Sequence, residues 1–162
     1  MEALDEAARI VRVLMSESIG AFVAAETRFP IADRLLKFGP AIIPLLERLL
    51  DQPIDDDARD HTAALLVELG SATGVPHLVS LLEHRSPHSI LAAIVLGKAR
   101  VKEAIPLIRR ILDEWDCAVD PYTAATLIGV LKKLDAPTDS LKASLRRRWP
   151  MKMKPGLEEL MR

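Results

Sequence analysis

The chain has 162 residues, a net charge of −1, and a composition that is 49% hydrophobic but only 4% aromatic. This length suits one domain whose core, built from aliphatic residues, needs neither metals nor disulfides. Its one cysteine, Cys117, excludes an internal disulfide, and no apolar run approaches the 18 residues that read as a membrane-spanning helix. Cys117 and an acidic start without the basic region of a signal peptide lead us to expect a cytoplasmic protein.

The N-terminal third predicts a helical cap followed by a first pair of helices. Apolar residues recur at helical spacing within residues 1–29, which we expect to form one bent helix or two short ones. Pro30 then suits the first turn of a short helix, and Gly39 ends it, because glycine adopts a left-handed conformation at little steric cost. A partner helix is expected from Pro40 to Leu50.

The second pair has the clearest boundaries. The run Asp55-Asp56-Asp57 provides an N-cap and negative charge where a helix dipole favours both, so a helix should follow it. That helix should continue to Leu69 and end at Gly70. Thr73 is expected to cap the next helix.

Two further pairs complete the chain. After Pro87, the apolar stretch up to Leu96 predicts a sandwiched helix that Gly97 ends, followed by a second helix. Asp120 and Pro121 then supply a cap and a first-turn proline for the fourth pair. In that pair Asp135 stands where glycine would be expected, and a last helix should run from Thr138 or Asp139 to Arg148.

Three of these pairs share one pattern, in which a helix ends in Leu-Gly or Phe-Gly and the next begins with an apolar residue and proline. The matching residues are Phe38, Gly39, Ile43, Pro44, Leu46 and Leu50; Leu69, Gly70, Val75, Pro76, Leu78 and Leu82; and Leu96, Gly97, Ile105, Pro106, Ile108 and Leu112. A fourth copy, with Asp135, Leu141 and Leu145, lacks the glycine and the proline. Over about residues 30–148 the chain therefore resembles the HEAT-repeat family, in its short bacterial form related to phycobilin lyases.

The resemblance implies an all-α, right-handed α-solenoid of about four helix pairs, with an N-terminal helical cap and with the second helices lining a concave side. We therefore expect one domain over residues 1–162. Its parts are a cap (1–29), four helix-pair repeats (30–53, 54–85, 86–119 and 120–149) and a tail (150–162). HEAT-like proteins mostly bind other proteins, a minority bind nucleic acid, and a few are lyases or glycosylases.

Residues that could carry chemistry are scattered. The histidines, His61, His77, His84 and His88, lack neighbouring Cys or Glu at metal-ligand spacing, so solvent-facing or capping roles are favoured. The aspartates at 55–57 and Asp60 lack the central glycine and late glutamate of a calcium loop, and capping explains them. Cys117 is a less favoured nucleophile. Asp116 with Trp115 and Trp149 is a less favoured base-stacking pocket of the kind found in HEAT-like DNA glycosylases. The sequence predicts no catalytic residue, cofactor or metal.

Superposing the second helices by their leucines aligns exposed positions, which we interpret as the partner-binding surface. These positions are Arg48, Gln52, His77, Ser80, His84, Arg110, Glu114 and Arg147. The favoured function is a non-enzymatic adaptor or scaffold that binds a protein partner on its concave face. Two alternatives stay open. One is a subunit of a HEAT-like lyase or other enzyme, and the other is nucleic-acid binding through the basic residues 146–154.

Overall fold

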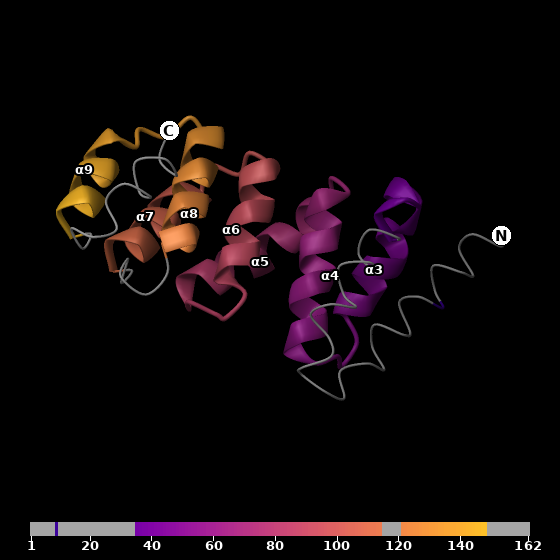
Figure 1. Cartoon of the computed structure of the whole chain (residues 1–162). Coiled ribbons are helices and arrows are strands. Elements are labelled where there is room, and N and C mark those ends of the chain that lie inside the picture. Colours follow the sequence, from indigo (N-terminus) through magenta and orange to yellow (C-terminus); the bar gives the residue numbers. More distant parts are fainter. Residues whose placement is uncertain (1–8, 10–34, 115–120, 149–162) are drawn as a thin grey trace. The chain divides into compact units, whose positions relative to one another are not determined.

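The computed structural model describes residues 9, 35–114 and 121–148, and the regular secondary structure of this part of the chain is all helical (Figure 1). It contains seven α-helices and two short 3-10 helices, and no strand occurs among the described residues. The predicted all-α class is thus confirmed for this part. The predicted tail (150–162), and the predicted cap (1–29) apart from residue 9, lie outside it.

The chain divides into two compact units, Met1–His77 and Leu78–Arg162. The boundary falls inside α5 (Val75–Glu83), so the first turn of this helix belongs to unit 1 and the rest to unit 2. The single-domain organisation expected from the sequence stays a prediction.

Unit 1 is built around α3 and α4. The 3-10 helix η1 (Gly39–Ile42) leads directly into α3 (Ile43–Leu50), which packs against α4 (Asp56–Glu68). The short helix η2 (Ala72–Gly74) packs on α4 and continues into α5. The aliphatic side chains of these elements form one core cluster, whose buried members are Leu35, Ile42, Leu46, Leu49, Leu65 and Leu66.

Side-chain caps define where the helices of unit 1 begin. The Asp55 carboxylate accepts a 2.8 Å hydrogen bond from the N–H of Ala58, which confirms the predicted N-cap of α4. The predicted cap at Thr73 is wrong. The Ser71 hydroxyl accepts from the N–H of Thr73, because η2 begins at Ala72, before the expected helix.

Unit 2 contains α6 (Ser89–Lys98), α7 (Ala104–Glu114), α8 (Pro121–Lys133) and α9 (Asp139–Arg148). Helix α6 packs against α7 and α8, and α7 packs against α8 and α9 (Figure 1). The contact surfaces are aliphatic, with Leu96, Ile108, Leu112, Leu127 and Leu131 fully buried. The predicted last helix, beginning at Asp139 and ending at Arg148, is confirmed.

Four helices, α4, α5, α6 and α8, end in the same hydrogen-bonded turn. In each, an N–H beyond the helix donates to a carbonyl five residues earlier: Ser71 to Leu66 (2.9 Å), Ser86 to Leu81 (3.0 Å), Val101 to Leu96 (2.9 Å) and Ala136 to Leu131 (3.0 Å). The residue before each donor has a positive φ: 91° at Gly70, 53° at Arg85, 58° at Arg100 and 58° at Asp135. This is the Schellman motif, and only one of the four left-handed positions is glycine.

The prediction that Gly97 ends its helix is therefore wrong. Gly97 lies inside α6, and the left-handed residue that closes α6 is Arg100. Gly97 serves packing instead, since a Cβ added there would lie 2.5 Å from Cγ1 of Val130 on α8. Gly74 has a comparable role in unit 1, where an added Cβ would collide with the backbone carbonyl of Ala63. At both positions the missing side chain lets two elements approach closely.

Candidate functional site

Three of the predicted partner-binding residues lie in unit 1. Arg48 and Gln52 are exposed, and the Arg48 guanidinium bonds the Pro44 carbonyl one turn earlier in its own chain segment. His77 is half-buried, and its Nε2 lies 2.6 Å from Oδ1 of Asp60. Asp60 is only 5% exposed, so the prediction that it belongs to a capping run is wrong. It joins α4 to α5 through His77.

The other five lie in unit 2, and four of these contact α5 or the residues that follow it. His84 Nδ1 lies 3.2 Å from the Ser80 hydroxyl and 2.9 Å from the Ser80 carbonyl. Arg110 on α7 donates a 3.0 Å hydrogen bond to the carbonyl of Glu83 at the end of α5. Glu114, one turn further along α7, forms an ion pair with Arg85.

Arg147 is exposed on α9, apart from these contacts. The structure therefore brings together Ser80 on α5 and His84 just after it with Arg110 and Glu114 on α7, through the end of α5.

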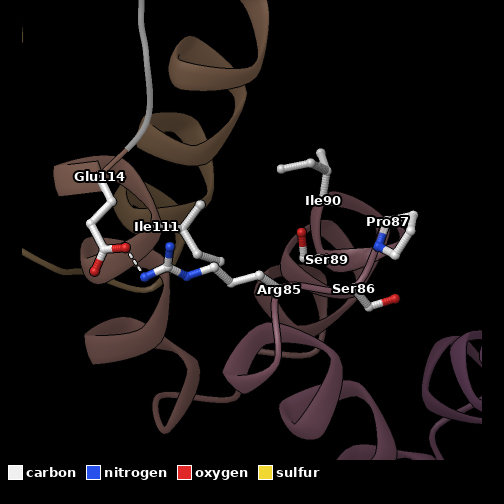
Figure 2. Close-up of a pocket in the computed structure, with 7 residues that line it drawn as sticks. All are labelled: Arg85, Ser86, Pro87, Ser89, Ile90, Ile111 and Glu114. Carbon is white, nitrogen blue, oxygen red and sulfur yellow. Dashed lines mark ion pairs between the residues drawn. The ribbon is translucent and has the colours of Figure 1, made fainter.

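A pocket of about 330 Å³ lies beside the Arg85–Glu114 ion pair, and we call it the α6 pocket. Figure 2 shows Arg85 reaching from the connection after α5 toward Glu114 on α7. Pro87, Ile90 and Ile111 supply its apolar lining. Both charged side chains remain about half exposed, at 51% for Arg85 and 45% for Glu114, so the pair lies at the solvent edge of the pocket.

Two serines add hydroxyl groups to the α6 pocket. The Ser86 hydroxyl accepts a 3.3 Å hydrogen bond from the N–H of His88 and so shapes the turn before α6. Ser89, the first residue of α6, is only 8% exposed, and no described residue bonds its hydroxyl. In Figure 2 this hydroxyl faces the space between Ile90 and Ile111. A buried serine whose hydroxyl opens into a pocket is available to a ligand.

The sequence did not single out Arg85 or Ser89. The signal was present in Pro87, which separates α5 from α6 and so places the residues on either side of it around one turn. What could not be read from the sequence is that Glu114, in a helix further along, pairs with Arg85 across that turn.

Residues proposed from the sequence for other chemistry do not assemble into a described site. No three His, Cys, Asp or Glu side chains within residues 35–114 and 121–148 lie together in a way that could hold a metal ion. His61 bonds the Asp57 carbonyl through Nδ1 at 2.8 Å. Trp115, Asp116 and Cys117 lie outside the described residues, as does most of the basic stretch after Arg148.

None of the described helices combines the length and the apolar character needed to cross a membrane. Comparisons of the chain with protein-family models, with curated proteins and with solved structures find no significant match. The residues and contacts of the chain itself must therefore support any function assigned to it.

Proposed function

We propose that the chain is a HEAT-like α-solenoid that binds a protein partner and acts as an adaptor or scaffold rather than as an enzyme. The partner surface is formed by the second helix of each pair. In this proposal the chain needs no cofactor, because its work is recognition, and its cytoplasmic location stays a prediction.

The pairing of helices within unit 2 is the observation that supports the repeat arrangement best. The first helices of two successive pairs, α6 and α8, pack on each other, and the second helices, α7 and α9, do the same. Stacking of like helices distinguishes a chain of repeats from a bundle that closes on itself. The spacing agrees, since the left-handed residues Gly70 and Arg100 close equivalent first helices 30 residues apart.

The composition of the second-helix surface favours binding. Helix α7 carries the exposed Arg110 and Glu114, and the exposed His84 directly follows α5, beside the residues that line the α6 pocket. Charged and polar groups around an apolar depression are typical of the rim and centre of a protein interface. The hydrogen bonds of Arg110 and His84 hold these side chains in place, so less side-chain entropy is lost when a partner binds.

The test is capture of partners from the native host with the full-length chain as bait. A variant carrying both Arg110→Glu and His84→Asp should recover the specific partner at least about tenfold less well than the wild type, since reversal of interface charges opposes association. The recovered proteins are quantified by mass spectrometry, and the helical content of each bait is checked by circular dichroism.

Lys133→Glu provides a matched control, because Lys133 is an exposed cation on the first helix α8. It should leave recovery unchanged. Full recovery by the α5/α7 double variant, or equal losses in both baits, would overturn the assignment of the second helices as the binding surface.

A further inference from the structure

We propose that the α6 pocket recognises an apolar side chain that lies next to a carboxylate on the protein partner. This inference rests on the proposed function, because it names the chemistry of the partner at one position of the second-helix surface.

The first argument is the Ser89 hydroxyl. Ser89 is 8% exposed and lines the pocket, yet its hydroxyl has no hydrogen-bond partner among the described residues. Among the described residues, Arg109 Nε is the one fully buried side-chain nitrogen or oxygen that lacks a partner. The Ser89 hydroxyl therefore keeps some access to solvent, and Ser89 lines the pocket. A nearly buried donor that opens only into a pocket gains its hydrogen bond from whatever occupies that pocket.

The second argument is the polarity of the pocket. Ser89 begins α6, a helix of ten residues, and no side-chain cap is provided by His88 at the N-cap position. The Ser89 N–H is engaged by the Ser86 carbonyl at 2.9 Å, while the positive end of the helix dipole lies on this side. The guanidinium of Arg85 adds a full positive charge and five N–H donors, of which the ion pair with Glu114 engages only part. These groups all favour an anion.

The third argument is the remainder of the lining, which is apolar. Ile90 on α6 and Ile111 on α7 face the pocket, as Figure 2 shows, and Pro87 lies beside them. An inorganic anion would leave this apolar surface exposed to water. An apolar side chain with an adjacent carboxylate satisfies both halves of the pocket, because the side chain covers the isoleucines and the carboxylate accepts from Arg85 and Ser89.

Glu114 is then the resident carboxylate, which the carboxylate of the partner displaces from Arg85. Substitutions at the two residues of this ion pair should therefore change the binding affinity in opposite directions. Removing the charge of Arg85 should weaken binding, whereas removing the charge of Glu114 should strengthen it, since the competing anion is lost. A purely structural ion pair would give the two substitutions the same sign.

The experiment measures binding of three fluorescent peptides to the full-length chain by anisotropy. One peptide ends in leucine with a free carboxylate, one is the same peptide with a C-terminal amide, and one is an amide with an internal Asp-Leu pair. The carboxylate peptides should bind at least about tenfold more tightly than the plain amide, as expected for a charge-assisted hydrogen bond. The preferred carboxylate peptide identifies the source as a chain terminus or an acidic side chain.

Four variants sharpen the result. Arg85→Gln should weaken carboxylate binding about tenfold or more, Ser89→Ala severalfold, and Glu114→Gln should strengthen it severalfold. Lys133→Gln, which removes an exposed cation on α8 outside the second-helix surface, should have no effect. Ser89→Ala and Glu114→Gln keep the measurement informative if Arg85→Gln unfolds the chain, because neither removes a contact from the core.

Equal affinity for the carboxylate peptides and the plain amide would overturn the proposal, as would weaker binding by Glu114→Gln or no peptide binding at all. These failures are distinct from failure of the proposed function. If the native partner is still captured and is lost on substitution of Arg110 and His84, the second-helix surface stands and only the pocket assignment falls.

Discussion

The end of α4 in unit 1 and the end of α6 in unit 2 carry the same dipeptide, Leu-Gly, and use it in different ways. Gly70 follows α4 and takes a φ of 91°, with nothing within 4 Å of the position that a Cβ would occupy. Gly97 is inside α6, and a Cβ there would lie 2.5 Å from Val130 on α8. The first glycine serves backbone conformation and the second serves packing between helices. One sequence motif thus stands for two physical requirements.

The same substitution at both positions separates the two requirements. Gly97→Val should have the larger effect and lower the free energy of unfolding by about 3 kcal/mol, because added methyl groups overpack a tight helix contact. The measurement is chemical denaturation followed by circular dichroism.

Val130→Ala provides the control for this packing effect. The double variant Gly97→Val/Val130→Ala should be more stable than the sum of the single changes indicates, with a coupling of about 1 kcal/mol or more. Strict additivity would show that the α6–α8 contact is not the reason for the glycine.

Gly70→Val comes next, with an expected loss of about 1–2 kcal/mol from forcing a side chain into the left-handed region. Since no neighbouring atom is displaced, no second-site substitution should relieve this loss. Gly70→Asn should be milder, because asparagine tolerates this conformation better. Thermal unfolding of the three proteins tests the order, and equal stability of wild type and Gly70→Val would contradict the cap at α4.

Arg100→Gly should have the smallest effect and the opposite sign. Arg100 is exposed and holds a φ of 58°, so glycine there removes strain and should raise the free energy of unfolding by roughly 0.5–1 kcal/mol. Ala99→Gly is the matched control, since Ala99 has a φ of −76° and glycine should lower stability there. Destabilisation by both changes would indicate that Arg100 contributes through its side chain.

The elements of the fold were largely predictable from the sequence, whereas two of their boundaries were not. Asp55 marked the start of α4 and Gly70 its end, because both residues act through local hydrogen bonds and backbone conformation. The role of Gly97 depends on Val130 in another helix, so no local pattern could reveal it. Arginine is not a residue type that indicates a helix end in a sequence, although the backbone of Arg100 adopts the left-handed conformation of one.

The candidate site followed the same division. Helical spacing placed Arg110 and Glu114 on one face of α7, and the structure shows both in contact with the end of α5 or the residue after it. The sequence assigned Asp60 to a cap, while the structure buries it against His77. The sequence also gave no role to Ser89. Its hydroxyl is available to a ligand because no described residue bonds it, and the spacing of residues along a chain does not predict this.

The Schellman turns described above let a helix terminate on hydrogen bonds rather than on one type of amino acid. Arginine twice and aspartate once occupy the left-handed position among the described residues, and backbone hydrogen bonds close each of these turns. The residue type at such a helix end can therefore change during evolution while the fold is kept. Sequences that differ at the left-handed position can therefore close their helices with the same backbone turn.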